Sequence, residues 1–597
     1  MASHQSTIRT MYGLSRRLAY HSQLPDGQNS FSALVIMLFV NSHSHDMEEG
    51  QHMKKSKIKD KTEAGKKSKS RDRQVDEEPM RADLKEVIER HSRGLDEQRP
   101  QAVARRRKTG QRTIRENIKD LCDGHFMEYG ALAVAAQRQR RSMEDLMSKT
   151  PADGVVAGIG QVNRSLFGED RARCMIIAYD YTVLAGTQGF FGHKKKDRML
   201  ILAHEQRLPV VLFAEGGGGR PGDVDADGVV VAGLDLATFA MFARLSGKVP
   251  VVGIVSGRCF AGNAVLLGCC DVIIAAQNAN IGMAGPVMIE GGGLGVFKPE
   301  DIGPMDVQTK NGVVDIAVAD DTEAVTVARK YLSYFQGAVS QWEAADQRLL
   351  RNMVPEQRRY VYDVRAIIKT MADTDSFLEL RPKFGPEMIT GLIRIEGRPF
   401  GVIANNCQHQ AGAIEAEGAD KAARLMQLCN AHGLPMVSLV DTPGFMVGPE
   451  IEHRAQVRHI CRMFVVGSHL TAPFFTVFLR RGYGLGAQAM AKGGFHEPFF
   501  AVAWPTGEFG GMGLEGAVRA GFRKELEAMK EPQEREALYE KLVALAYERG
   551  KAINMASYLE IDAVIDPADT RRWITEGLKA APAERTERAG HDFVDTW

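Results

Sequence analysis

The chain has 597 residues, of which 44% are hydrophobic and 25% charged, the balance of an ordinary globular protein with apolar material for several domains. Its 76 lysines and arginines nearly match its 75 aspartates and glutamates, so the net charge of +1 gives no reason to expect a nucleic-acid partner or an anionic membrane surface. The 8 cysteines form no CxxC pair and no Cys/His ligand spacing, so we expect free thiols in a reducing compartment and no metal site.

Residues 1–80 have the composition of a leader that does not fold. The first 25 residues contain arginines but no acidic residue, a weak likeness to a transit peptide, and residues 54–73 are almost entirely polar and charged. The longest apolar run near the start, residues 33–40, is too short to span a membrane. We therefore expect a cytoplasmic protein, or one of the mitochondrial matrix if the leader is a real transit peptide.

A helical, amphipathic segment follows over residues 80–149, with Leu84, Val87, Ile88 and His91 on one face. Its basic cluster at residues 105–108 is either a solvated helix face or a receiver of phosphate groups. From residue 154 to residue 337 strands and helices alternate, with strands predicted at 174–179, 209–213 and from 250, and helices at 194–207 and 234–245. Strands joined by helices predict a parallel sheet core.

The second half of the chain repeats this pattern. The stretch from Arg398 corresponds to the stretch from Arg173, 225 positions earlier, and the Leu-Pro pair at 434–435 corresponds to the pair at 208–209. The segment 250–271 (PVVGIVSGRCFAGNAVLLGCCD) likewise corresponds to the segment that starts at Pro473. Three landmarks at nearly constant offset predict a tandem repeat of one α/β unit.

Each repeat has a turn of small residues between a buried strand and a helix. The turn is Ala261-Gly262-Asn263 in the first repeat and Leu485-Gly486-Ala487 in the second. Free backbone N–H groups at such a turn can stabilise an enolate or a tetrahedral oxyanion. The chain has no G-x-S-x-G and no GxxxxGK[ST] motif, so we expect no ATP site and catalysis by backbone donors.

Several motifs resemble those of the carboxyltransferase (beta) subunit of biotin-dependent acyl-CoA carboxylases, the group of the propionyl-CoA and methylcrotonyl-CoA carboxylases. They are the GQRTIREN segment from Gly110, DYTVLAG from Asp180, GRCFAGNA from Gly257, DTPGF from Asp441, YGLGA from Tyr483 and WPTGE from Trp504. The chain departs from the family pattern at Asn263, where a second glycine is usual, at Leu485, and in the glycine loop at 215–223.

The resemblance implies an α/β fold of two crotonase-like ββα superhelix domains with an N-terminal helical extension. The implied domains are 81–350 for the acyl-CoA side and 391–597 for the biotin side, joined by a connector at 351–390. The first turn would hold the enolate of the thioester and the second the ureido oxygen of biotin. The implied substrate-binding residues are Arg112, Arg115, Ala185, Gly186, Gly217, Gly218, Gly219, Arg220, Gly285 and Gln488, the last as a determinant of acyl size.

The implied reaction transfers a carboxyl group from carboxybiotin to the alpha or gamma carbon of an acyl-CoA ester. Biotin would come on a separate biotin carboxylase or carrier chain, because the only EAMK sequence, at 527–530, lacks the second methionine of a biotin site. The expected assembly is a homo-oligomer, a hexamer built from dimers. Three alternatives stay open: a subunit of a sodium-pumping acyl-CoA decarboxylase, a hydratase or isomerase of the crotonase group, and a catalytically silent scaffold.

Overall fold

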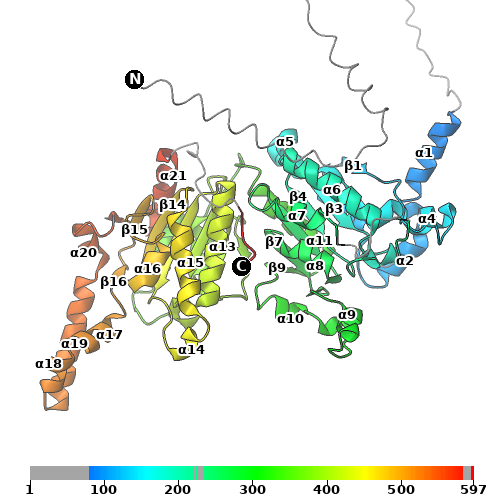
Figure 1. Ribbon diagram of the computed structural model, residues 1–597. Coiled ribbons are helices and arrows are strands. Elements are labelled where there is room, and N and C mark those ends of the chain that lie inside the picture. The colour runs from blue at the N-terminus through cyan, green and yellow to red at the C-terminus, as the bar shows by residue number, and fades with distance from the viewer. Residues whose placement is uncertain (1–79, 221, 226–233, 582–592) are drawn as a thin grey trace, which may run out of the picture. The chain divides into compact units, whose positions relative to one another are not determined.

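The computed structural model describes residues 80–220, 222–225, 234–581 and 593–597, so the predicted leader lies outside the described residues except for Met80. The described chain is an α/β protein with two large mixed sheets (Figure 1), which confirms the predicted class. None of the helices in these ranges is long and apolar enough to cross a bilayer.

The first sheet has seven strands in the order β1-β2-β3-β4-β5-β7-β9. Their bounds are β1 (Phe126–Tyr129), β2 (Val155–Gln161), β3 (Arg173–Tyr179), β4 (Val210–Phe213), β5 (Val251–Val255), β7 (Val272–Ala276) and β9 (Ile316–Val318). The two pairings from β1 to β3 are antiparallel and all later ones are parallel. A separate pair, β6 (Arg258–Phe260) and β8 (Asn280–Gly282), lies after the end of β5.

The second sheet repeats this order strand for strand, as β10-β11-β12-β13-β14-β15-β17. Its strands are β10 (Leu378–Leu380), β11 (Met388–Ile395), β12 (Arg398–Asn405), β13 (Met436–Thr442), β14 (Phe474–Tyr483), β15 (Phe500–Ala503) and β17 (Ala563–Val564), with β16 (Glu508–Gly510) beside β14. Its first two pairings are again antiparallel and the rest parallel. The first strand of this sheet, β10, falls inside the predicted connector.

Corresponding helices follow corresponding strands. In the first half α6 (Phe190–Glu205) follows β3 and α8 (Gly262–Gly268) follows β6, while in the second half α13 (Ala416–His432) follows β12 and α16 (Gly484–Met490) follows β14. Other helices of these units are α7 (Thr238–Ala243), α9 (Pro286–Gly291), α10 (Met305–Gln308), α11 (Asp321–Ser333), α12 (Val364–Met371), α14 (Pro449–Glu452), α15 (Gln456–Ser468), α20 (Ala552–Ser557) and α21 (Thr570–Ala580). The central parallel strands, among them β4, β5, β7 and β13, are buried on both faces, as their β-branched runs predict.

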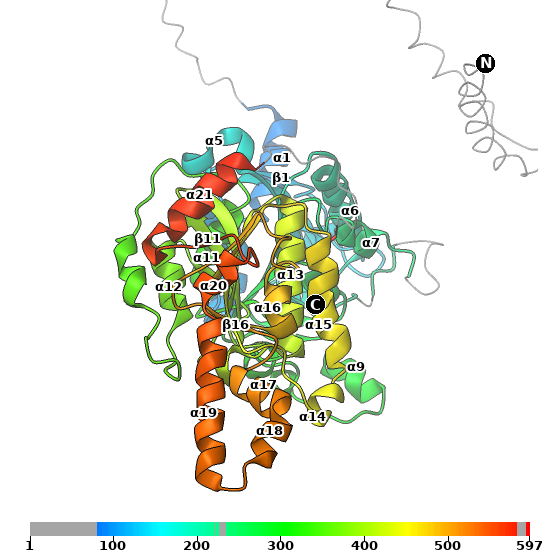
Figure 2. The same cartoon turned by 90° about the vertical axis from the view of Figure 1, so that its left-hand side faces the viewer.

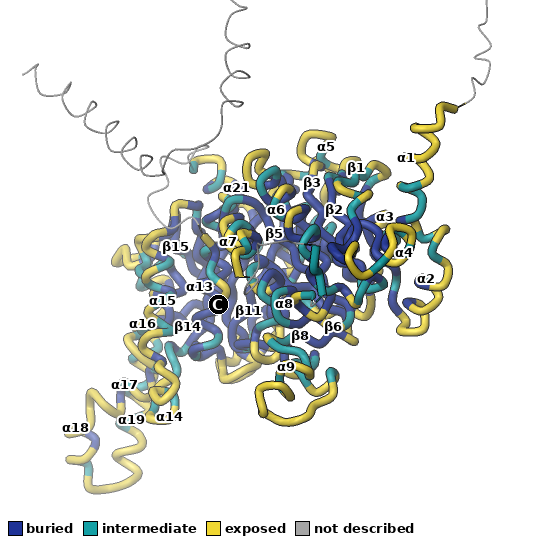
Figure 3. The backbone as a smooth tube through the Cα atoms, turned by 45° about the vertical axis from the view of Figure 1, so that its right-hand side comes forward, coloured by how far each residue is buried: buried dark blue, intermediate teal, exposed yellow. Residues whose placement is uncertain are grey.

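A group of N-terminal helices and a C-terminal arm complete the fold, and most residues of the arm are exposed (Figure 3). The first group comprises α1 (Ala82–Ser92), α2 (Pro100–Arg107), α3 (Ile114–Leu121), α4 (Met143–Lys149) and α5 (Arg164–Ala172). The segment predicted as helical also contains β1, whose pairing with β2 outweighs the helical pattern. In the arm, α17 (Leu514–Gly521), α18 (Arg523–Ala528) and α19 (Pro532–Arg549) lie side by side (Figure 2).

Candidate active site

The first small-residue turn lies where β6 ends and α8 begins. Ala261 has φ 53° and ψ −127°, so the chain turns sharply before the helix, and its N–H already donates to the carbonyl of Gly282 at 3.2 Å. The next N–H groups, of Gly262 and Asn263, are the first of the helix, and the first N–H groups of a helix have no partner within it. The turn therefore offers the donors of Gly262 and Asn263, while that of Ala261 holds the loop in place.

The glycine loop packs directly against this turn. A Cβ atom on Gly218, whose φ is +88°, would lie 2.7 Å from the Cβ of Ala261. A Cβ on Gly186, at φ +64°, would lie 2.2 Å from the carbonyl oxygen of Glu215. Positive φ and the lack of room for a side chain both demand glycine at these two positions. The structure thus brings three predicted segments together: residues 185–186, the loop at 216–219 and the turn at 261–263.

Asn263 is the buried centre of these three segments. Its Nδ2 donates to the carbonyls of Gly186 and Glu215, each at 3.3 Å, and its Oδ1 accepts from the N–H of Gly218 at 3.2 Å and from Gln188 Nε2 at 3.1 Å. The residue has no exposed surface. Its side chain is therefore turned into the protein, and the departure from the family's glycine leaves the outer side of the turn open.

The predicted substrate-binding arginines have partners inside the protein. Arg115 pairs with Glu128 at 3.0 Å, and Arg112 pairs with Asp120 at 2.5 Å. Arg220 is 3% exposed and forms an ion pair with the buried Asp153. Arg220, which follows the glycine loop, thus holds that loop against Asp153, and the substrate-binding roles of the three arginines stay predictions.

The remaining predicted residues of the first half lie around the same loops. Ala185, at φ 54°, forms the turn before Gly186. Gly217 and Gly219 continue the glycine loop, and a Cβ on Gly219 would meet no atom within 4 Å. Gly285 caps α9, where a Cβ would lie 3.4 Å from the ring of Phe260.

The second turn has the same construction at the end of β14. A Cβ atom on Gly486 would lie 2.8 Å from the Cα of Gly444, in the DTPGF loop, so the two backbones are in close contact. Ala487 is fully buried, whereas Leu485 is 61% exposed and Gln488 is also exposed. Residues three apart share a helix face. The exposed face of α16 at its N-terminus is therefore formed by Leu485 and Gln488.

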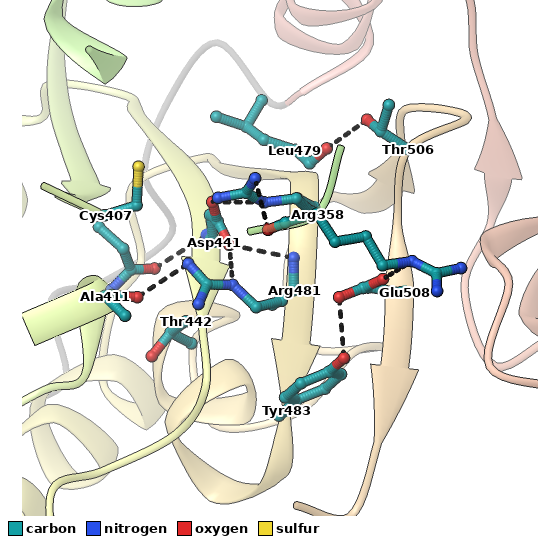
Figure 4. A network of polar contacts seen from close by, with 12 residues as sticks. Arg358, Cys407, Ala411, Asp441, Thr442, Leu479, Arg481, Tyr483, Thr506 and Glu508 are labelled. Atoms are coloured by element: carbon teal, nitrogen blue, oxygen red, sulfur yellow. Dashed lines mark hydrogen bonds and ion pairs between the residues drawn. The ribbon is translucent and has the colours of Figure 1, made fainter. Parts of the chain in front are cut away.

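A buried ionic network supports the second turn (Figure 4). The carboxylate of Asp441, which is fully buried, accepts from Arg481 Nε at 2.6 Å and pairs with Arg480 Nη2 at 2.9 Å. Burial alone would raise the pKa of Asp441, but the two arginine charges outweigh it and hold that pKa below its ordinary value. Tyr483, the last residue before α16, donates to Glu508 at 2.9 Å. These contacts fix the strand end from which the turn starts.

The family follows from comparison with known proteins. A model described as the carboxyl transferase domain matches residues 105–591. The chain belongs to the carboxyl transferase family. It is 32% identical over 74% of its length to the biotin-dependent acetyl-/propionyl-coenzyme A carboxylase beta6 subunit of Mycobacterium tuberculosis, 92% of which it covers. It is 30% identical over 81% of its length to the methylmalonyl-CoA carboxyltransferase 12S subunit of Propionibacterium freudenreichii, 91% of which it covers. The predicted resemblance is confirmed, and the chain is a carboxyltransferase of the acyl-CoA carboxylase type.

Two solved structures share its fold at useful identity. A single-chain, multi-domain long-chain acyl-CoA carboxylase is 57% identical over 83% of this chain, with a TM-score of 0.79. This carboxyltransferase spans only 49% of that longer chain. The transcarboxylase 12S subunit, described as a hexamer with methylmalonyl-coenzyme A bound, is 27% identical over 87% of this chain, with a TM-score of 0.74.

Some polar residues of the site were not among the predicted ones. Gln188 is hydrogen-bonded to Asn263 of the first turn and to Lys196, and Arg480 pairs with Asp441 in the network that supports the second turn. Asp441 lies in a quoted motif, but the motif does not say that its carboxylate faces two arginines. Lys196 stands within the charged run at 194–198, so the sequence carried no signal that set it apart from its neighbours.

Proposed function

We propose that this carboxyltransferase moves a carboxyl group between biotin and the α carbon of a long-chain acyl-CoA ester. The pair of small-residue turns, at equivalent places in two sheets of one strand order, carries the proposal. The proposed length of the acyl chain rests on the sequence identity of 57% to a long-chain acyl-CoA carboxylase, compared with 27% to the structure with methylmalonyl-coenzyme A. We also take over from the family the crotonase-type description of each repeat.

The first turn would bind the thioester carbonyl. The N–H groups of Gly262 and Asn263, which have no partner within α8, would donate to the carbonyl oxygen of a bound thioester. As a proton leaves the α carbon, negative charge collects on this oxygen, and donors already in place stabilise it without reorganising. The glycine loop at 216–219 lines the same turn and lets a planar thioester approach the backbone.

The second turn fits a planar amide-like group of biotin. The close contact of Gly486 with Gly444 leaves no side chain over the N–H groups at the start of α16, and Leu485 supplies an exposed apolar surface beside them. When bound there, biotin supplies the carboxyl group and, after its release, a basic nitrogen. The N–H groups of Gly486 and Ala487 would hold the ureido oxygen of that ring.

The partners are proposed from the same resemblance. The chain contains no sequence that fits a biotin attachment site, since Lys530 lies between α18 and α19 and not on a β-hairpin. Biotin would therefore be presented by a carrier outside these residues, either a separate subunit or another domain, as the multi-domain relative suggests. The hexamer of the 12S subunit supports a homo-oligomer with a site shared between copies.

The assay runs the transfer in reverse, because this direction needs no ATP and no carrier. The protein is incubated with free biotin and with malonyl-CoA, methylmalonyl-CoA or 2-carboxypalmitoyl-CoA, and biotin-dependent release of the carboxyl group is measured. We expect the highest kcat/KM with the C16 ester. A preference for malonyl-CoA would refute the chain-length proposal, and no biotin-dependent release from any ester would favour the silent scaffold.

The sodium-pumping decarboxylase remains the second candidate, because its carboxyltransferase would run this same half-reaction. Affinity purification of the chain from its own cells distinguishes the two: an ATP-dependent biotin carboxylase supports the carboxylase, and a membrane decarboxylase supports the alternative.

A further inference from the structure

A chain of buried polar side chains runs beneath the first turn. The ammonium group of Lys196, on α6, donates to Gln188 Oε1 at 3.1 Å, and Gln188 Nε2 donates to Asn263 Oδ1 at 3.1 Å. Asn263 in turn accepts from the N–H of Gly218 at 3.2 Å. One buried charge is thus linked through two amide side chains to the glycine loop.

The backbone of Gln188 is bound to the same loop on both sides. Its N–H donates to the carbonyl of Gly218 at 2.7 Å, and its carbonyl accepts from the N–H of Arg220 at 2.9 Å. Its side-chain Nε2 would lie 2.9 Å from a Cβ atom placed on Gly262. Gln188 therefore touches both the glycine loop and the first residue of α8.

The ammonium group of Lys196 and the backbone of the loops together set which way these amides face. An ammonium group can only donate, so it selects the oxygen of Gln188 and leaves the Gln188 NH₂ to face Asn263. Asn263 must then present its oxygen to Gln188 and Gly218, and its NH₂ to the carbonyls of Gly186 and Glu215. The contacts of Asn263 with the backbone of the two loops require this same orientation, so the cation and the loop backbone favour one arrangement of both amides.

Burial of the Lys196 ammonium group has an unfavourable free energy of desolvation. Lys196 is 1% exposed, and the two side chains that accept hydrogen bonds from it, Gln188 and the Tyr179 hydroxyl at 2.6 Å, are both neutral. Within the described residues no carboxylate forms an ion pair with it, and burial lowers the pKa of Lys196 to about 7. A buried charge without a counter-ion opposes folding, so its presence points to a functional demand.

The second repeat shows that the fold does not require these polar groups. The backbone bridge between Gln188 and Gly219 recurs between Ile414 and Phe445, 226 positions later. Ile414 is fully buried, and Ala422, also fully buried, stands 226 positions after Lys196. Apolar residues thus fill the same places in the same architecture.

We propose that Lys196 and Gln188 are positioning residues of the first turn, which act through Asn263 to hold the glycine loop and the donors of Gly262 and Asn263 in register. This inference rests on the proposed function of the turn. It also assigns a role to the asparagine that replaces the family's second glycine: Asn263 is the end of a polar chain that begins at Lys196.

The test is a double-mutant cycle on the biotin-dependent reaction. Lys196→Met keeps the volume but removes the charge, and we expect kcat to fall about tenfold to a hundredfold with KM changed less than threefold. In the Asn263→Gly background the link is already cut, so adding Lys196→Met should change kcat less than threefold. An equal loss of kcat in both backgrounds, or no loss in either, would overturn the proposal.

Gln188→Leu supplies a second variant that leaves the charge in place, and it should reproduce the loss of kcat. The matched control is Lys421→Met, a buried lysine bound to the carbonyls of Phe384 and Met388 and remote from the turn. It should lower the melting temperature but keep the kcat of the folded enzyme.

Hydrogen exchange gives a readout that needs no turnover. The peptide over residues 214–220 should exchange faster in Lys196→Met and in Gln188→Leu than in the wild type, and unchanged exchange in both variants would overturn the proposal. If the wild type shows no carboxyl transfer but this exchange does change, the proposed function fails while the positioning network stands.

Discussion

Gly218→Ala is expected to lower kcat by more than its effect on the stability of the fold explains. The new Cβ would lie 2.7 Å from the Cβ of Ala261, and the φ of +88° is strained for alanine. Strain of this kind costs about 1–3 kcal/mol, and overpacking adds about 1–3 kcal/mol. The turn relieves the clash by moving Ala261, and misplacing one oxyanion donor lowers kcat by about 10²–10³.

The assay compares biotin-dependent carboxyl release per folded enzyme with the melting temperature. Gly433→Ala is the matched control, because Gly433 has φ +71° at the end of α13 but a Cβ there would meet no atom within 4 Å. The control should lose about 1–2 kcal/mol of stability and keep its kcat. A folded Gly218→Ala enzyme with wild-type kcat would refute the role given to the glycine loop.

Three further predictions concern the second turn. Gly486→Ala brings a Cβ to 2.8 Å from Gly444 Cα, so it should raise KM for biotin or abolish transfer while acyl-CoA binding, measured by calorimetry, is retained; lost acyl-CoA binding would contradict the division of roles. Asp441→Asn leaves two buried arginines facing each other and should lower the free energy of unfolding by about 3–5 kcal/mol in chemical denaturation. Because the pKa of Asp441 is lowered in the folded protein, its stabilising effect is present above the ordinary pKa of 3.8 and is lost as the pH falls through the lowered pKa. The variant should show no such acid-dependent loss of stability. Gln488→Ile should change the relative rates across acyl chain lengths by several-fold, and an unchanged ranking would remove Gln488 from acyl selection.

Much of the fold was predictable because its signals are local. Buried β-branched runs mark the parallel strands of both sheets, and the repeated Pro-initiated strands reveal the duplication. The strand β1 was missed, because a four-residue edge strand carries a weaker pattern than the helices around it. The charged stretch at 523–549 has no apolar face to mark its elements, and it forms two helices, the second of which starts at Pro532.

The candidate site was predictable in its backbone but not in its side chains. Glycines and small residues mark both turns, since close backbone contact tolerates little else. Whether Arg220 faces a ligand or Asp153 depends on contacts between residues 67 positions apart, which no local pattern encodes. The same holds for Asn263, whose partners come from two separate loops, at 186–188 and 215–218.

The proposed function requires one chain to join a thioester site to a biotin site. The most direct measurement is transfer of a ¹³C-labelled carboxyl group from 2-carboxypalmitoyl-CoA to free biotin, followed by mass spectrometry of both products. We predict labelled carboxybiotin and palmitoyl-CoA in equal amounts, and a strongly reduced rate of formation of both products in Gly218→Ala. Release of labelled carbon dioxide at the same rate with and without biotin would contradict the proposed function.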